Sequence, residues 1–300
     1  MVTQKDVLLE GKHGGSLEAL EVTSDECGAS IRVTKFGGTL YSYKDADGEE
    51  KLFASEEGHT DRSKPVRGGV PLVFPQFGGG ELPKHGFART SEWLLEDTPT
   101  EQDGIVTVAF VLESNEETLK IWPFKFKLVH NIVFGASKLQ TSMHVVNVGE
   151  EAFKFQALLH TYYLIEDISQ VQVVGLKGLS YVDQLRESNT FTEENDPITF
   201  EAETDRIYTD AKGPIEILDG KSKKISIELS LSTGEDGTDI KPCDAVLWNP
   251  WTEKSKGMGD FGDEEFHTMM CLEPGCVSRY ETCEPNATWV LTQRVTFSKM

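Results

Sequence analysis

The sequence predicts an all-β protein built from large antiparallel sheets. Runs of β-branched and apolar residues such as 105–112 (IVTVAFVL) have the composition of strands. In other runs, such as 139–145, apolar and polar residues alternate with a period of two. Turn residues separate these runs at spacings typical of antiparallel sheets, and convincing helix patterns are absent. Many strands with almost no helix indicate a sandwich or a barrel.

The expected strands follow one another along much of the chain. In chain order they cover residues 105–112, 126–134, 139–145, 153–160, 171–174, 225–231 and 289–297. Segments 91–95 and 263–269 could each form a turn or two of helix. Segment 254–265 (KSKGMGDFGDEE) is polar and glycine-rich between apolar segments, so we expect a mobile loop there. No linker divides the chain, which predicts a single domain of residues 1–300.

Composition narrows the class of protein. With 300 residues, 38% hydrophobic and 26% charged, the chain is typical of a soluble globular protein. Its net charge of −21 argues against nucleic acid and anionic membranes as partners. The first 15 residues lack the apolar core of a signal peptide, so we expect a cytoplasmic protein, and we expect it to be a monomer. Five cysteines without a CxxC pair favour reduced thiols over disulfides or a zinc site.

Residues 62–89 form a basic segment in this acidic chain. The segment contains one acid, Glu81, and five cations: Arg62, Lys64, Arg67, Lys84 and Arg89. Its apolar middle (residues 70–77) is flanked by glycines, which permit positive φ and close approach of the backbone to a ligand. This pattern indicates a local anion site. The alternative is a glycine- and proline-rich loop with scattered surface charges.

Two residues are candidates for acid–base chemistry. His160 lies at the end of an expected strand beside two tyrosines, and Glu273 ends an apolar strand just before a Pro-Gly turn. A buried carboxyl group must be paired, hydrogen-bonded or shifted in pKa. The alternatives are a histidine satisfied at a sheet surface and a strand-end glutamate facing solvent.

The sequence alone leaves the roles of several other residues undecided. Asp205 could pair with Arg206, Asp183 could cap a turn, and Trp248 and Trp251 could either stack on a sugar or fill the core. The remaining histidines show no metal-ligand spacing, and the chain lacks nucleotide-binding and nucleophile-elbow motifs. We therefore expect no metal and no organic cofactor.

Six motifs together resemble the hexose-6-phosphate mutarotases, the glucose-6-phosphate 1-epimerases of the aldose 1-epimerase superfamily, which include plant proteins called apospory-associated protein C. The motifs occur in family order over about residues 67–289: VRGGVPLVFPQFG, LPKHGFAR, LLHTYY, DRIY, LWNPWTEKSKGMGDF and CLEPG. The resemblance implies the galactose-mutarotase-like β-supersandwich fold. That fold agrees with the strand pattern above.

The resemblance also implies roles for individual residues. His160 and Glu273 match the catalytic histidine and glutamate, with Glu273 as the base and His160 as the acid. Substrate-binding positions of the family fall on Arg67, Lys84, His85, Arg89 and Asp205. Lys84 stands where relatives often have Gln, and Asp183 is the alternative to Asp205 as the binding aspartate.

The activity implied by the resemblance is isomerisation of a carbohydrate. It is the interconversion of the α and β anomers of aldohexose 6-phosphates by acid–base ring opening and closure, without a cofactor. The rivals are a neutral-aldose mutarotase, a non-catalytic carbohydrate-binding protein and a glycoside hydrolase that uses two carboxylates.

Overall fold

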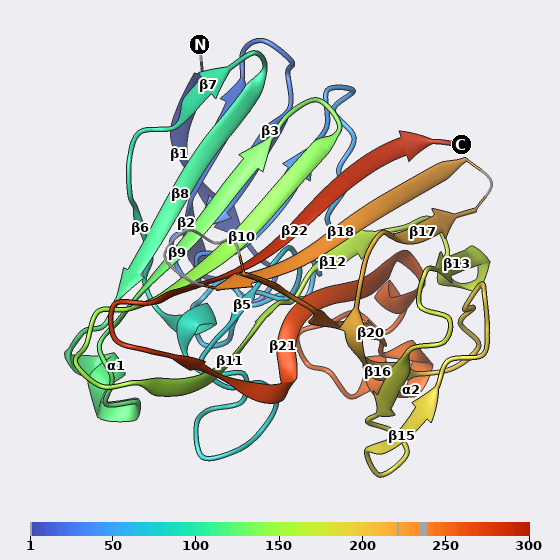
Figure 1. Ribbon diagram of the computed structural model, residues 1–300. Helices are drawn as coiled ribbons and strands as arrows, with labels where there is room; N and C mark the ends of the chain where they lie inside the picture. The colour runs from blue at the N-terminus through green and yellow to red at the C-terminus, as the bar shows by residue number, and fades with distance from the viewer. Residues whose placement is uncertain (1, 221, 234–238) are drawn as a thin grey trace.

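The computed structural model describes residues 2–220, 222–233 and 239–300, which form three antiparallel sheets (Figure 1). The N-terminal sheet has four strands in sequential order: β1 (Val2–Glu10), β2 (Ser16–Ser24), β3 (Ser30–Thr34) and β4 (Leu40–Lys44). Among the described residues, no helix is long and apolar enough to cross a membrane.

The second sheet has ten strands. Eight of them form a continuous path: β13 (Val171–Val174), β17 (Ile215–Asp219), β18 (Lys223–Thr233), β22 (Thr288–Lys299), β10 (Lys138–Asn147), β9 (Phe126–Phe134), β8 (Ile105–Glu113) and β6 (Leu94–Leu95). Strand β19 (Asp239–Lys241) pairs with β18, and β7 (Thr100–Gln102) pairs with β8. In Figure 1 the long strands from β8 to β18 lie side by side across the upper part of the molecule.

The third sheet has eight strands. Seven form the path β15 (Asn189–Thr192), β14 (Ser180–Asp183), β16 (Thr204–Ala211), β20 (Cys243–Asn249), β21 (Met269–Cys283), β11 (Phe153–Leu159) and β5 (Leu72–Val73). Strand β12 (Tyr162–Leu164) pairs separately with β21. This sheet packs against the ten-stranded sheet, since the rings of Phe155 on β11 and Trp289 on β22 lie 5.1 Å apart. The amide of Gln293 on β22 also donates to Thr161 Oγ1 between β11 and β12, at 2.7 Å.

The seven expected strand ranges are confirmed in position, whereas the end of a strand expected at Glu273 is wrong, because β21 pairs with β20 through Pro274 and Gly275 and continues to Cys283. Residues 126–134 and 171–174 coincide with β9 and β13, and four others lie inside β8, β10, β18 and β22. The strand expected over 153–160 ends one residue earlier, at Leu159. Alternation succeeds here because each of these strands buries one face against another layer.

The helical elements of the described residues are short. They are α1 (Glu116–Ile121), α2 (Trp251–Lys256) and three 3₁₀ turns: η1 (Ala88–Thr90), η2 (Ile168–Gln170) and η3 (Glu265–Thr268). The expected turn near 263–269 is confirmed by η3, whereas a helix over 91–95 is wrong because β6 begins there and pairs with β8. The sequence analysis missed α1, although Asn115 and Thr118 form a capping box at its start.

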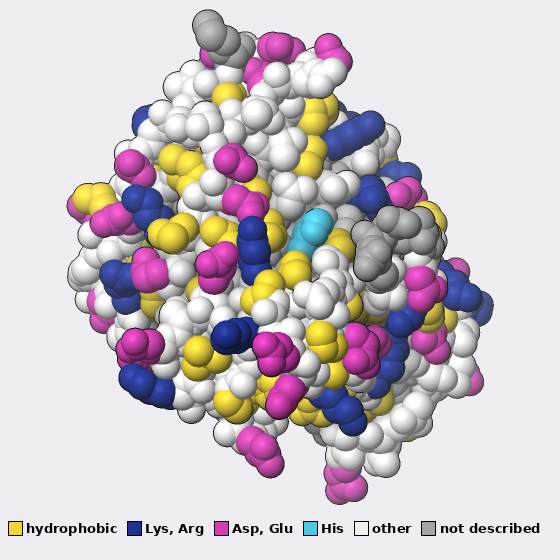
Figure 2. Space-filling view, turned by 60° about the vertical axis from the view of Figure 1, so that its left-hand side comes forward, with side chains coloured by type: hydrophobic (Ala, Val, Ile, Leu, Met, Phe, Trp, Pro, Cys, Tyr) yellow, Lys and Arg dark blue, Asp and Glu magenta, His cyan; other side chains and the backbone are white. Residues whose placement is uncertain are grey.

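Surface charge is mixed on the face drawn in Figure 2. Lysine and arginine side chains there are interspersed with aspartate and glutamate, and they do not gather into one broad basic area. The cations that matter for an anion site must therefore be located from contacts, residue by residue.

Candidate active site

Strand register places a row of candidate residues on one face of the eight-stranded sheet. Tyr162 lies opposite Cys271, Cys271 lies opposite Trp248, and Trp248 lies opposite Asp205. Directly paired residues share a face of a sheet. Glu273 follows Cys271 by two positions on β21, so its side chain points to the same side.

His160 is held between β11 and β12 by its backbone and its ring. Its N–H donates to the carbonyl of Pro71 at 3.0 Å. Its ring stacks on Tyr162 with centroids 4.7 Å apart and an interplanar angle of 8°, and Trp248 meets it edge-on at 6.1 Å. In this orientation His160 Nδ1 lies 3.2 Å from Glu273 Oε1. The two expected catalytic residues are thus in direct contact.

Burial governs the protonation of this pair. Only 12% of the His160 side chain and 2% of the Glu273 side chain are exposed. Desolvation raises the pKa of Glu273 well above its usual range, and the charge of Asp205 acts in the same direction. Desolvation also lowers the pKa of His160, reinforced by the nearby His85 and Arg67. Burial therefore favours a neutral pair with its proton on Glu273, whereas the expected roles require an ionised Glu273 and a protonated His160.

Cys271 is a site residue that the sequence analysis did not identify. Its Sγ lies 3.8 Å from His160 Nδ1, and burial raises the pKa of its thiol well above the usual range. Its spacing of two residues from Glu273 in a strand was the available signal, because that spacing places both side chains on one face.

Arg67 lies beside the pair and has two partners within the protein. Its Nε and Nη2 donate to Asp260 Oδ2 at 3.2 and 2.9 Å, and its Nη1 donates to Tyr162 Oη at 3.1 Å. Asp260 lies in segment 254–265, which the sequence analysis treated as a mobile loop. The structure instead ties this segment to the site through Asp260 and begins it within α2. Sequence inspection gave no reason to pair Asp260 with Arg67.

Arg89, Lys84 and His85 come from the second half of the basic segment. Arg89 Nη2 donates to the carbonyl of Lys84 at 2.8 Å, while its buried Nε has no partner among the described residues. Burial lowers the pKa of Arg89 to about 10, which leaves it a cation at neutral pH. Burial and the charge of Arg89 lower the pKa of His85 to about 3, and the His85 ring lies 6.0 Å from that of His160. His85 is therefore a neutral hydrogen-bonding group.

Of the two candidate aspartates, Asp205 is the one whose charge acts on Glu273. Burial raises the pKa of Asp205 to about 6, and Lys254 opposes this shift. Asp183 accepts a hydrogen bond from the N–H of Leu185 at 3.0 Å, as expected for a turn cap. This geometry favours Asp205 over Asp183 as a substrate contact.

Two glycines of the basic segment are required by backbone packing. Gly69 has φ +64°, and a Cβ there would lie 2.1 Å from the carbonyl oxygen of Leu40. Gly86 has φ +69°, and a Cβ there would lie 2.0 Å from the carbonyl oxygen of Phe74. Residues with side chains would clash at both positions. The close approaches at these glycines follow Arg67 by two residues and His85 by one in the chain.

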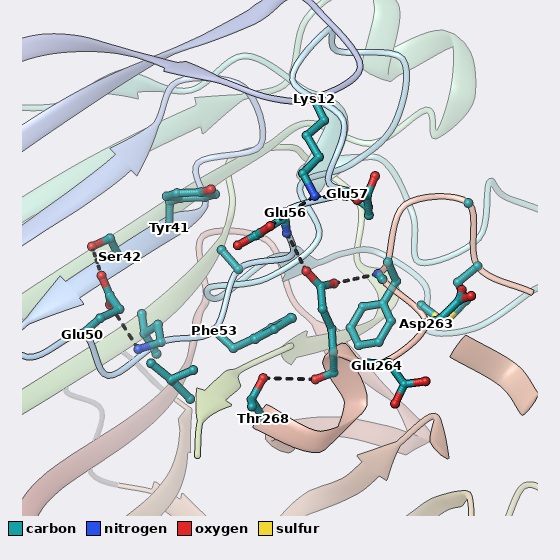
Figure 3. Close-up of a pocket in the computed structure, with 18 of the residues that line it drawn as sticks. Lys12, Tyr41, Ser42, Glu50, Phe53, Glu56, Glu57, Asp263, Glu264 and Thr268 are labelled. Atoms are coloured by element: carbon teal, nitrogen blue, oxygen red, sulfur yellow. Dashed lines mark hydrogen bonds and ion pairs between the residues drawn. The ribbon is translucent and has the colours of Figure 1, made fainter. Parts of the chain in front are cut away.

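A separate cleft, shown in Figure 3, is not lined by the predicted site residues. Its volume is about 1090 Å³, and residues that line it include Lys12, Tyr41, Glu50, Glu56, Glu57 and Glu264. Glu265 joins its walls by accepting hydrogen bonds from Ser55 Oγ and from the N–H groups of Glu56 and Gly262, at 2.6, 2.8 and 2.7 Å. The cleft is roomy, but the acid–base pair lies elsewhere, on the face of the eight-stranded sheet.

The fold and the sequence together define the class of protein. Residues 19–296 match the aldose 1-epimerase family, and the chain belongs to that family. It is 38% identical over 271 residues to a protein of Cenchrus ciliaris named "Putative glucose-6-phosphate 1-epimerase", a match that spans 88% of this chain and 79% of the relative. An Escherichia coli protein of the same name is 29% identical over 100% of this chain and 97% of its own length.

Solved structures agree with the expected fold. The chain superimposes with a TM-score of 0.84 on a Salmonella typhimurium structure described as a "putative mutarotase", with 26% identity over 98% of this chain and 97% of that one. A galactose 1-epimerase from Lactobacillus acidophilus has a TM-score of 0.68 at 14% identity, over 100% and 99% of the two chains, and supports the fold alone. The galactose-mutarotase-like, mostly β fold is therefore confirmed.

Proposed function

We propose that this protein interconverts the α and β anomers of aldohexose 6-phosphates, chiefly glucose 6-phosphate. The observation that carries the proposal is the buried contact of 3.2 Å between His160 Nδ1 and Glu273 Oε1 beside arginine side chains. Family membership supports mutarotation of a sugar. The names of the relatives and the cations of the basic segment support a phosphorylated one.

The reaction needs one proton removed from the C1 hydroxyl and one delivered to the ring oxygen. Glu273 accepts the first and His160 donates the second, after which C1–C2 rotation presents the other face and the two groups reverse their roles. Each such group typically contributes about 100- to 10,000-fold in rate. Two of them are sufficient for a reaction that is not very slow without a catalyst.

The resting protonation of the pair adds one step to this scheme. Burial favours the proton on Glu273, so it must move to His160 across their 3.2 Å contact before Glu273 can act as a base. Hydrogen bonds from sugar hydroxyls to the Glu273 carboxylate favour its charged form and so assist this transfer. Substrate binding therefore activates the pair.

The phosphate group accounts for the neighbouring cations. Arg89 is a candidate for direct contact, since its buried Nε has no partner among the described residues. Arg67 and Lys84 add positive charge, and a guanidinium can hold phosphate through two parallel hydrogen bonds. In a chain of net charge −21, a dianionic substrate also requires a local positive field.

One observation favours a neutral-sugar mutarotase as the second candidate. Arg67 already donates three hydrogen bonds to Asp260 and Tyr162, so its charge is balanced within the protein. On this alternative, Arg67 positions Tyr162 under the His160 ring and does not contact a phosphate.

NMR magnetisation exchange between the anomers, with and without protein, separates these possibilities. We expect faster exchange for glucose 6-phosphate and little effect on glucose. Equal acceleration of both sugars would support the neutral-sugar mutarotase. If folded protein accelerates neither sugar, the enzymatic proposal is wrong and a carbohydrate-binding protein takes its place.

A further inference from the structure

Three potential metal ligands meet at the proposed catalytic pair. His160 Nδ1, Cys271 Sγ and a Glu273 carboxylate oxygen all lie within 4.8 Å of one another, and all three residues are buried. We propose that they form a binding site for a thiophilic divalent cation such as Zn²⁺, which competes with the sugar and reversibly stops turnover. The loss of turnover rests on the function proposed above, whereas binding of the metal does not.

The distances fit a tetrahedral zinc site. Zinc binds histidine nitrogen at about 2.0–2.1 Å, carboxylate oxygen at about 2.0–2.2 Å and cysteine sulfur at about 2.3 Å. Tetrahedral angles then place nitrogen about 3.4 Å from oxygen and about 3.6 Å from sulfur. The observed separations from His160 Nδ1 are 3.2 Å to Glu273 Oε1 and 3.8 Å to Cys271 Sγ. The third separation, between Cys271 Sγ and a Glu273 carboxylate oxygen, is within 4.8 Å. A tetrahedral site needs about 3.6 Å there, so the Glu273 carboxylate or the Cys271 side chain must turn toward the metal on binding.

The backbone holds these atoms in place before any metal arrives. Cys271 and Glu273 project from the same face of β21, and β20 pairs with both, through Trp248 and Val246. The stacked ring of Tyr162 fixes the plane of the His160 imidazole. Because little ordering remains to be done on binding, the site resembles a preformed metal centre.

Charge and ligand type favour zinc over magnesium. A cysteine thiolate and an imidazole suit zinc, whereas magnesium prefers a shell made of oxygen atoms. Zn²⁺ displaces one proton from the Cys271 thiol and one from the Glu273 carboxyl group, and both protons leave to solvent. With a neutral His160, a thiolate on Cys271 and a carboxylate on Glu273, the bound Zn²⁺ forms a centre of zero net charge. A neutral centre avoids the large cost of an isolated charge in a buried site.

Three protein ligands leave a fourth position for water or a sugar hydroxyl. The bound metal takes both atoms to which proton transfer was assigned, His160 Nδ1 and the Glu273 carboxylate. Metal binding and mutarotation therefore exclude each other, and removal of the metal restores the enzyme.

Cobalt(II) provides a probe that does not depend on activity. Full-length wild-type protein titrated with Co²⁺ should bind one ion per chain and show the near-ultraviolet band of thiolate ligation and strong tetrahedral visible bands. Glucose 6-phosphate should weaken this binding. A Co²⁺ spectrum without a thiolate band in wild-type protein would overturn the proposal.

Variants assign the ligands. Cys271→Ser and Cys271→Ala should each lose the thiolate band and weaken Zn²⁺ binding by more than about 100-fold, since even outer-shell changes cost about 10- to 100-fold. Cys27→Ser is the matched control, because Cys27 is the most accessible of the five free cysteines. Its spectrum and affinity should match those of wild type. If both Cys271 variants misfold, His160→Asn provides the test by its loss of the tetrahedral bands.

Inhibition is measured last, relative to the metal-free rate of each variant. Zn²⁺ should abolish mutarotation in wild type and Cys27→Ser, and a chelator should restore it. If the protein binds the metal through Cys271 but turns over neither sugar, the proposed metal site stands and the proposed function is wrong. Full turnover with the site loaded by Zn²⁺ would overturn the inhibitory role. Unchanged Zn²⁺ affinity in folded Cys271→Ala would overturn the site.

Discussion

A buried and an exposed histidine–glutamate pair in this protein have nearly the same separation. His160 Nδ1 lies 3.2 Å from Glu273 Oε1, and His267 Nε2 lies 3.3 Å from Glu264 Oε2 beside the cleft of Figure 3. The first pair has 12% and 2% of its side chains exposed, and the second has 49% and 80%. Distance alone does not distinguish them.

Burial makes the difference between the two pairs. Water screens the exposed pair, and contacts of this kind contribute little to stability or reactivity. In the buried pair, desolvation raises the pKa of Glu273 and lowers that of His160, and the proposed reaction begins with a proton transfer between them. The cleft is large, but the groups proposed for proton transfer are those withdrawn from water.

Removal of either member of the buried pair should have the largest effect. His160→Ala and Glu273→Gln should each slow glucose 6-phosphate mutarotation by about 100- to 10,000-fold, because each removes one proton-transfer group. Turnover is followed by NMR exchange, and circular dichroism checks the fold. A loss below about tenfold in either variant would contradict the assignment of the pair.

Arg67 tests whether the surroundings of the buried pair bind phosphate. Arg67→Ala should raise KM for glucose 6-phosphate by about 10- to 150-fold, which corresponds to a charge-assisted hydrogen bond of about 1.5–3 kcal/mol. Any mutarotation of free glucose should change much less. Arg62→Ala is the matched control, since Arg62 belongs to the same basic segment but pairs with Glu92 at the surface.

Arg67→Ala also leaves Asp260 without its partner. The double variant Arg67→Ala/Asp260→Asn removes this orphaned carboxylate and separates lost binding from lost stability. Equal losses for glucose and glucose 6-phosphate in the double variant would assign Arg67 to the positioning of Tyr162.

Asp205 should make stability depend on pH in a defined window. Burial raises its pKa from an ordinary 3.8 to about 6, so the folded state binds this proton more tightly than the unfolded chain. Its contribution to the free energy of unfolding is therefore fully present below about pH 4 and is lost as pH rises through 6. Urea denaturation between pH 4 and 7 should show a flatter profile for Asp205→Asn than for wild type. Parallel profiles would mean that the folded protein does not raise this pKa.

The exposed pair should give the smallest effect. His267→Ala and Glu264→Gln make the same substitutions as in the buried pair, yet each should change turnover by less than about twofold because water screens their contact. The same NMR assay measures both. A loss of turnover as large as that of His160→Ala would show that the cleft takes part in the reaction. Burial would then not distinguish the two pairs.

Local signals in the sequence located the long strands of the ten-stranded sheet, but not the N-terminal sheet of β1 to β4. Alternation in 139–145 and the β-branched run in 105–112 depend only on neighbouring residues, and β10 and β8 form there. Where the period-two alternation is interrupted, the strand prediction becomes less accurate. A register shift between Phe155 and Ala157 breaks the period of two just before His160. The sequence pattern also predicted a helical turn where β6 lies, because a strand of two residues is too short to show a period of two.

The candidate site was found by a different kind of signal. His160, Glu273 and the binding residues came from six motifs in family order, while composition and spacing left each of them open. The structure brings Asp205 and Glu273 to one face of the eight-stranded sheet, and the charges of Arg67, His85 and Arg89 act on the adjacent His160.

The sequence by itself determined the long strands of the ten-stranded sheet, the apolar middle of the basic segment and the identity of the polar groups available for chemistry. Tertiary structure alone decided which of those groups meet and what burial does to them. Arg67 and Asp260 lie 193 positions apart, and Cys271 reaches His160 across 111. Such contacts depend on how whole sheets pair and pack, and desolvation is a property of that assembly, so neither can be derived from a local pattern of residues.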